Sequence, residues 1–180
     1  MYKHCATEES AQRQRQLEQC LLELMLTVQY PAITISDICD RAGISRKSFY
    51  RYFSSKEGCL YALLDHAIFD GASYYLPDHH IDSATGIIFE RFFNYWKDKK
   101  LLLDALQQNN LNMLLVERMI LHVAKEENEF RIFLHHQDFT AHERSMFYVG
   151  GIMTLVLDWH MSGYQKTVLQ MSRILDDLIR

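Results

Sequence analysis

Apolar residues recur at the spacing of an α-helix along almost the whole chain. The first such run is Leu17, Leu21, Leu24 and Val28, with Glu and Gln between its members. It predicts one apolar face on a helix from about residue 10 to residue 29, which Tyr30-Pro31 then ends. The alternation typical of a strand is confined to residues 33–35. We therefore expect an all-α protein without a sheet.

The composition fits a compact helical protein. The 180 residues include only 7 Gly and 2 Pro, and 48% are hydrophobic, which excludes disordered and collagen-like chains. The nearly continuous apolar stretch 146–157 is much shorter than the roughly 20 residues that a bilayer-spanning helix needs. The first ten residues, MYKHCATEES, lack the apolar segment of a signal peptide, so we expect a cytoplasmic protein. The 4 Cys residues show no CxxC spacing and are expected to be reduced.

Two later helix starts carry the pattern of a capping box. Ser54 and Glu57 are three positions apart, as are Thr140 and Glu143. In this motif the hydroxyl accepts a hydrogen bond from the third helical amide, and the Glu side chain reaches back to the cap amide. The pattern predicts helices that begin near residues 55 and 141.

Residues 33–58 form the segment that most directly indicates a function. Thr34 is placed to cap a short helix through Ala42, and Gly43 permits a left-handed turn. Ser45 can cap a second short helix, Arg46 to Tyr52. Two short helices joined by a Gly-containing turn are typical of a helix-turn-helix, whose second helix enters the DNA major groove.

The exposed face of the second helix supplies the candidate DNA contacts. Phe49 and Phe53 point inward at i, i+4, which leaves the polar residues outside. Residues 34–56 hold five Lys or Arg and two Asp, while residues 57–180 hold eleven basic and seventeen acidic residues. A basic patch on an acidic body suits a local phosphate contact. The predicted DNA-binding residues are Thr34, Ser45, Arg46, Lys47, Ser48, Tyr50, Arg51, Tyr52 and Lys56. Among these, the basic residues of the helix are candidates for guanine edges, and the hydroxyls and the Lys56 ammonium for phosphates.

The run from Thr34 to Glu57 resembles the DNA-binding signature of TetR-family transcriptional regulators. The resemblance includes Asp37-Ile38, Ala42-Gly43 and the cluster Tyr50-Arg-Tyr-Phe53, and with the preceding helix it covers about the first third of the chain. Two departures stand out. Many members have Gly at the positions of Gln29 and Lys47, so the first helix is expected to end with a different cap, and operator preference cannot be transferred from a relative.

The resemblance implies a helix-turn-helix domain over residues 1–54 and a ligand-binding and dimerisation body over 55–180. It also implies a regulator, most often a repressor, that binds a double-stranded DNA operator as a homodimer and responds to a small-molecule effector. Within the body, residues 144–161 are apolar nearly all round, so we expect this helix to be buried on every side and to pair, together with residues 166–179, with its twofold copy. An intrachain core helix is the alternative. The predicted dimer contacts are Phe147, Gly150, Gly151, Thr154 and Leu175.

Aromatic residues in the body are candidates for an effector pocket. The resemblance implies an apolar small-molecule pocket, and the predicted lining residues are Phe92, Trp96, Phe130 and Tyr148. An aromatic stripe at helical spacing is also what a core requires, so the two interpretations stay open.

Other functions have less support in the sequence. His79-His80 and His135-His136, with Asp138 and His142, could supply metal ligands, but adjacent His on a helix diverge by about 100°, so we expect no metal site and no cofactor. We find no GxSxG, HExxH, GxGxxG or P-loop motif, so we do not expect an enzyme. A regulator whose body binds a partner protein instead of a small ligand is the alternative.

Overall fold

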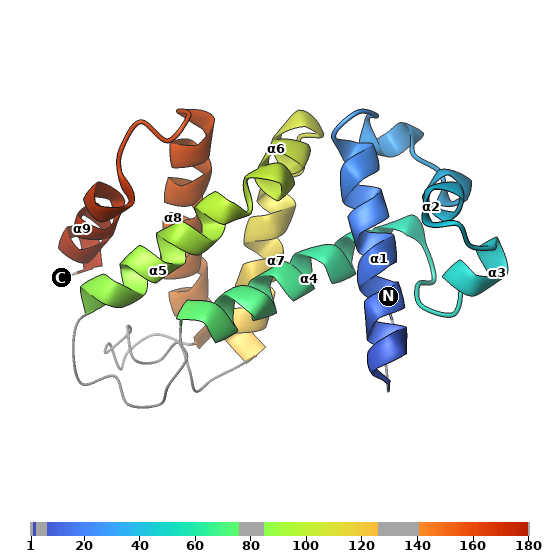
Figure 1. The fold of residues 1–180 in the computed structure, drawn as a ribbon. Coiled ribbons are helices and arrows are strands. Elements are labelled where there is room, and N and C mark those ends of the chain that lie inside the picture. The colour runs from blue at the N-terminus through green and yellow to red at the C-terminus, as the bar shows by residue number, and fades with distance from the viewer. Residues whose placement is uncertain (1, 3–6, 76–84, 126–140, 180) are drawn as a thin grey trace. The chain divides into compact units, whose positions relative to one another are not determined.

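A computed structural model of the chain describes residues 2, 7–75, 85–125 and 141–179, and these are almost entirely helical (Figure 1). The elements are α1 (Glu8–Met25), the 3-10 turn η1 (Tyr30–Ala32), α2 (Ile35–Ala42), α3 (Arg46–Phe49), α4 (Lys56–Tyr75), α5 (Thr85–Asp98), α6 (Lys100–Gln108), α7 (Asn112–Lys125), α8 (Ala141–Met161) and α9 (Val168–Ile179). Over the described ranges, β-pairing is limited to an isolated bridge between Tyr2 and Phe53. The predicted all-α class is confirmed.

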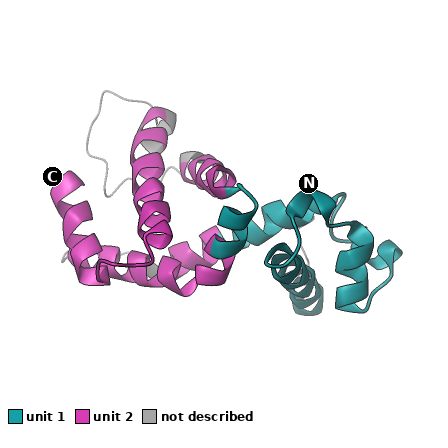
Figure 2. Ribbon diagram, turned by 90° about the horizontal axis from the view of Figure 1, so that it is seen from above, with its two compact units in different colours: residues 1–67, 104–111 teal, residues 68–103, 112–180 magenta. Residues whose placement is uncertain are grey.

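The chain divides into two compact units (Figure 2). The first comprises residues 1–67 and 104–111, and the second comprises residues 68–103 and 112–180. Helices α4 and α6 therefore contribute to both units. The first unit extends past residue 54, where the sequence analysis divided the chain, and it includes the end of α6. The functional division at that residue stays a prediction.

Helix α1 begins where a side chain supplies its first cap. The Thr7 hydroxyl accepts a hydrogen bond from the Ser10 amide at 3.3 Å, and the buried side of the helix includes Leu17 and Leu21 as the periodicity predicted. The helix ends at Met25, earlier than predicted. Val28 lies beyond it in a turn and is 40% exposed, so it does not belong to the apolar face.

The core of the first unit joins helices that are distant in sequence. Its members are nearly inaccessible to solvent, with at most 2% exposure. They include Leu17, Leu21, Ile38, Phe49, Phe53, Leu60 and Leu64. Because side chains from α1, α2, the α3 region and α4 share this core, the short helices need not be stable alone.

The second unit packs α5 against α8 and α9, and α7 against α8 (Figure 1). Phe93 and Trp159 lie edge to face at 5.5 Å, and both are buried. The Ser172 hydroxyl donates to the Gly86 carbonyl at 3.1 Å, which adds a polar link between α9 and α5. Within the described part of the chain, no helix is long and apolar enough to cross a membrane.

Helix α8 begins at Ala141, near the predicted position. The sequence predicted burial on every side through pairing with a twofold copy, and that pairing stays a prediction. One side is buried, including Val149, Met153 and Val156, whereas Gly151 and Thr154 on the other side are exposed. Within a single chain, the helix therefore presents an uncovered apolar face.

Candidate nucleic-acid interface

The first helix of the candidate interface begins with a reciprocal cap. The Thr34 hydroxyl accepts from the Asp37 amide at 3.2 Å, and an Asp37 carboxylate oxygen accepts from both the Thr34 amide and the Thr34 hydroxyl at 2.7 Å. These bonds favour the ionised carboxylate and lower the pKa of Asp37 below its ordinary value. The Thr34 cap predicted from sequence is confirmed, with Asp37 as its partner.

The turn between α2 and α3 uses the backbone freedom of glycine. Gly43 has φ +65°, and the following Ile44 amide donates to the Cys39 carbonyl at 3.0 Å. A side chain at position 43 would meet no heavy atom within 4 Å, so the constraint is conformational rather than steric. The predicted left-handed turn is confirmed.

Helix α3 starts as predicted and ends sooner. The Ser45 hydroxyl accepts from the Ser48 amide at 3.2 Å, and the α-helix ends at Phe49 instead of Tyr52. The next amides of Arg51 and Tyr52 donate to carbonyls three residues back, so the chain tightens into turns. This tightening accompanies the full burial of Phe49, which is 0% exposed.

The side chains predicted to contact DNA remain on the outside of this motif. Arg46, Lys47, Tyr50 and Arg51 are exposed, and Tyr50 retains 44% of its surface. A hydrogen bond with Tyr50 is the main cause that raises the pKa of Arg46, so the guanidinium stays charged beside an aromatic hydroxyl. The predicted phosphate candidates are exposed or half-buried in the same segment, namely Thr34, Ser45, Ser48 and Tyr52. Their contacts with DNA stay predictions.

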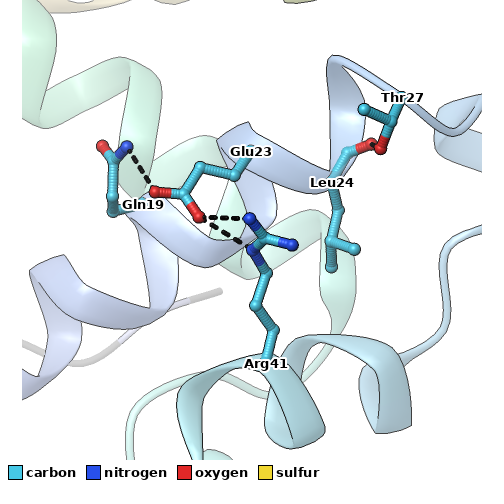
Figure 3. A network of polar contacts seen from close by, with 5 residues as sticks. All are labelled: Gln19, Glu23, Leu24, Thr27 and Arg41. Atoms are coloured by element: carbon cyan, nitrogen blue, oxygen red, sulfur yellow. Dashed lines mark hydrogen bonds and ion pairs between the residues drawn. The ribbon is translucent and has the colours of Figure 1, made fainter.

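A salt bridge joins α2 to α1 at the back of the motif (Figure 3). Two nitrogens of Arg41 lie 2.7 Å from one carboxylate oxygen of Glu23, and Gln19 donates to the other oxygen at 3.1 Å. The bonds from Gln19 and Arg41 lower the pKa of Glu23. Arg41 is therefore used inside the unit, although it belongs to the basic segment.

Lys56 makes contacts that the sequence did not indicate. Its ammonium nitrogen donates to the carbonyl oxygens of Tyr30 and Ile33 at 2.7 Å each and approaches that of Pro31 at 3.4 Å. It also lies 4.3 Å from the centroid of the Tyr30 ring. The ammonium predicted to contact phosphate is thus engaged with protein acceptors.

The start of α4 differs by one position from the predicted capping box. The Ser55 hydroxyl, not that of Ser54, accepts from the Gly58 amide at 3.2 Å. A backbone hydrogen bond at Glu57 itself, followed by one from the Ser55 side chain, lowers the pKa of Glu57. The predicted helix start near residue 55 is confirmed, but the box of Ser54 and Glu57 is wrong because the helix begins at Lys56.

The predicted pocket residues occupy different environments. Phe92 and Trp96 are buried on α5, with ring centroids 6.4 Å apart, and Tyr148 is half-buried on α8. The buried Trp96 indole N–H has no hydrogen-bond acceptor among the described residues. Phe130 lies outside the described residues.

The predicted dimer residues divide by exposure. Phe147 is 76% exposed, Gly151 and Thr154 are exposed, and Gly150 is half-buried. Leu175 is only 2% exposed, so it packs inside its own chain rather than on an open surface. The sequence could not separate these positions because both helices are apolar on more than one side.

Most residues of the metal hypothesis lie outside the described ranges, including His79, His80, His135, His136 and Asp138, and nothing is described of the His142 side chain. Across the described ranges, no three His, Cys, Asp or Glu residues gather in a group that could hold a metal ion.

Asn109, which directly follows α6, contributes to the first unit and was not predicted from the sequence. Its amide donates to the Met25 carbonyl at 2.9 Å and to the Ala105 carbonyl at 2.7 Å, and its oxygen accepts from the Tyr30 amide. The Asn-Asn pair at 109–110, with φ 56° at Asn110, is a local sign of a helix end. No local sign could identify partners 84 and 79 positions away.

Part of the first unit matches a known protein family. Residues 22–63 match the family model described as bacterial regulatory proteins, tetR family. Over 78 residues the chain is 40% identical to the HTH-type transcriptional regulator EthR of Mycolicibacterium smegmatis. That match covers 39% of this chain and 35% of EthR, so it spans about a third of the relative's length.

Solved structures share the fold over nearly the whole chain. A TetR transcriptional regulator from Streptococcus agalactiae has a TM-score of 0.67 at 14% identity, over 96% of this chain and 97% of that one. The fatty acid degradation regulator FadR from Bacillus halodurans has a TM-score of 0.61 at 12% identity, over 93% and 94%. These likenesses extend the fold beyond the matched segment. The segment 22–63, which contains the helix-turn-helix, is similar to the tetR family of bacterial regulatory proteins, and the solved structures share the fold of the whole chain.

Proposed function

We propose that this protein is a transcriptional repressor that binds a palindromic DNA operator as a homodimer and is released by a small-molecule effector. The observation that carries the proposal is the capped α2-turn-α3 motif, which holds Arg46, Lys47 and Tyr50 on an exposed face. Arg and Lys can donate to guanine O6 and N7, which distinguishes base pairs in the major groove. Ser and Tyr hydroxyls around them suit phosphate oxygens.

The exposed face of α8 supports a dimer. Phe147, Gly151, Thr154, Asp158 and Met161 follow one another at helical spacing, and all five are exposed in the single chain, with Asp158 as the charged member of this face. A side chain added at Gly151 would meet nothing within 4 Å, so the chain's own packing does not require glycine there. Glycine within a helix costs about 1 kcal/mol relative to alanine, which favours a close backbone approach by a partner.

Helix α9 extends the apolar surface offered to the partner. Leu169 and Leu178 are 46% and 67% exposed. Together with α8 it supplies the two helices that each chain contributes to a four-helix interface. A twofold homodimer carries two copies of α3, and reading successive major grooves requires them to lie about 34 to 36 Å apart on an operator with matching symmetry.

The effector part of the proposal is supported by the aromatic side chains of α5. Trp96 is fully buried, and its indole N–H lacks a described acceptor, which an effector carrying an oxygen or nitrogen acceptor could supply. Such an effector releases DNA by favouring a dimer in which the two copies of α3 have the wrong separation. Its effect is limited by its differential affinity for the two states.

A body that docks a partner protein is the second candidate, and one feature of α7 favours it. Met113 and Leu121, eight positions apart on that helix, are 64% and 39% exposed, and the exposed Glu117 lies between them. Exposed apolar side chains beside polar ones are a common feature of protein-binding surfaces. Release of DNA by a small molecule alone would exclude the need for such a partner.

The DNA proposal is tested by selecting bound sequences from random duplex DNA with the purified protein. A palindromic consensus is the expected result. The absence of any enriched sequence, with folded protein at every concentration tried, would contradict operator binding.

The dimer is tested separately by sedimentation of matched variants. Gly151→Glu places a charge on the proposed interface, whereas Met113→Glu places the same charge on α7. We expect a dimer for the wild type and Met113→Glu and a monomer for Gly151→Glu. A dimeric Gly151→Glu would remove this face from the interface.

A further inference from the structure

We propose that Asn109, which directly follows α6, is a positioning residue for DNA binding, which acts by fixing the turn that connects α1 to α2. This inference rests on the proposed DNA-binding function. Asn109 lies outside the helix-turn-helix in sequence, yet it belongs to the same compact unit. The first unit is therefore completed by a side chain from the second half of the sequence.

The Asn109 amide is held in one orientation. Its NH₂ group faces the carbonyls of Met25 and Ala105, and its oxygen faces the Tyr30 amide. Exchanging the nitrogen and the oxygen would place like groups against each other at all three contacts. The residue is 9% exposed, so water cannot easily replace these bonds.

The three bonds connect the end of one helix to the start of the next element. Met25 is the last residue of α1, and its carbonyl has no partner within the helix. Tyr30 is the first residue of η1. Asn109 thus bridges both ends of the short segment 26–29. The Gln29 side chain adds a bond in the same place, since its amide nitrogen donates to the Gln108 carbonyl at 3.2 Å.

Lys56 binds the same turn through its carbonyl oxygens. Its ammonium donates to the carbonyl of Tyr30, whose amide donates to Asn109. The ammonium also donates to the carbonyl of Ile33, the residue before the α2 cap. We call this arrangement of Asn109, Tyr30 and Lys56 the Tyr30 junction.

The Tyr30 junction affects DNA binding through the placement of α2. Thr34, the cap of α2, follows Ile33 directly, and α2 packs against both α1 and α3. A loosened junction lets α2 and α3 sample more orientations, so part of the binding free energy must restore the competent one. The side chains that face DNA are unchanged, but they are less well oriented.

The test uses Asn109→Leu, which keeps the approximate size and removes all three bonds, and Asn109→Ala in case the larger side chain does not fit. Gln108→Ala is the matched control because Gln108 is an exposed neighbour that offers only its backbone carbonyl. Binding to the selected duplex is measured at a temperature where each variant is fully folded. Hydrogen exchange of the Tyr30 amide is measured on the free proteins.

We expect faster exchange at Tyr30 and affinity about tenfold lower for the Asn109 variants, with the control unchanged, since a lost buried hydrogen bond has an effect of this order. The double variant Asn109→Leu/Lys56→Met should lose less than the product of the two single effects, because both act on Tyr30. The positioning role would be overturned if the double variant lost affinity by the full product of the two single losses. It would also be overturned if a folded Asn109 variant kept full affinity.

The two proposals fail in different ways. A wild type that binds no selected duplex would end the DNA proposal and the positioning role that rests on it. Unchanged exchange at Tyr30 in Asn109→Leu would overturn the Tyr30 junction alone, whatever the wild type binds.

Discussion

The Lys56 ammonium group donates to the Tyr30 carbonyl at 2.7 Å and lies 4.3 Å from the centroid of the Tyr30 ring. The Lys56 ammonium thus contacts both the backbone and the aromatic ring of Tyr30. Because the same ammonium donates to Ile33, it ties the start of α4 to the entry of α2. A lysine that the sequence assigned to phosphate contact acts within the protein.

Replacing Lys56 should therefore lower the free energy of unfolding and leave the salt dependence of DNA affinity nearly unchanged. Lys56→Met removes the charge-assisted bonds and should cost about 1.5 to 3 kcal/mol in the free energy of unfolding, measured with denaturant. A lysine bound to phosphate would instead lower the slope of log affinity against log salt by about one. That lowered slope with unchanged stability would show that Lys56 contacts DNA.

The hydroxyl of Tyr50 should matter for binding and little for folding. It is hydrogen-bonded to Arg46, and the ring is 44% exposed. Tyr50→Phe leaves the Arg46 side chain less restrained and removes a candidate phosphate donor, so affinity for the operator should fall severalfold. The free energy of unfolding should stay within about 0.5 kcal/mol. Unchanged operator affinity would mean that this hydroxyl faces no DNA.

The reciprocal cap of α2 should make stability depend on acid pH. Asp37 has a lowered pKa because it accepts bonds from Thr34, so its contribution is complete above the ordinary Asp value of 3.8 and is lost as pH falls through the folded pKa. Asp37→Asn should be less stable than the wild type at pH 7, and the difference should shrink on acidification. Glu23 and Glu57 also have lowered pKa values, but their contributions to the pH dependence are the same in both proteins and cancel in the difference. A difference that is constant with pH would refute the cap's role.

Two polar contacts of α1 carboxylates should differ in energy because they differ in burial. Arg41 and Glu23 are 45% and 40% exposed, so Arg41→Ala should cost about 1 kcal/mol or less. The Glu18 side chain is 2% exposed, and its two oxygens lie 2.9 Å from His66 Nδ1. His66→Ala leaves that buried carboxylate poorer in partners and should cost about 3 kcal/mol. Equal losses in denaturant unfolding would contradict this ranking.

The sequence predicted the features whose causes are local. Thr34 and Ser45 cap their helices, and Gly43 takes the left-handed conformation, because caps and turns depend on residues three or four positions away. The choice between Ser54 and Ser55 at the start of α4 was missed, since adjacent hydroxyls offer the same local signal. The early ends of α1 and α3 were missed because tertiary packing, not propensity, decides where short helices stop.

Features that depend on distant partners could not be predicted. Nothing around Lys56 shows that three carbonyls of a turn about 25 residues earlier surround it. Asn109 likewise meets Met25 only after folding. For α8, composition indicated burial but not which side is covered by the chain itself. Phe147 and Leu175 were therefore both predicted as dimer contacts, but Phe147 is exposed and Leu175 is buried in the structure.

The exposed face of α3 is proposed to bind a specific DNA sequence. The most direct measurement is the ratio of affinities for the selected duplex and a scrambled duplex, at one ionic strength, for the wild type and Arg46→Ala/Lys47→Ala. We predict a ratio of about 10³ or more for the wild type and a loss of about 10- to 100-fold for each base contact removed. A folded double variant that keeps the full ratio would show that Arg46 and Lys47 do not read the DNA sequence.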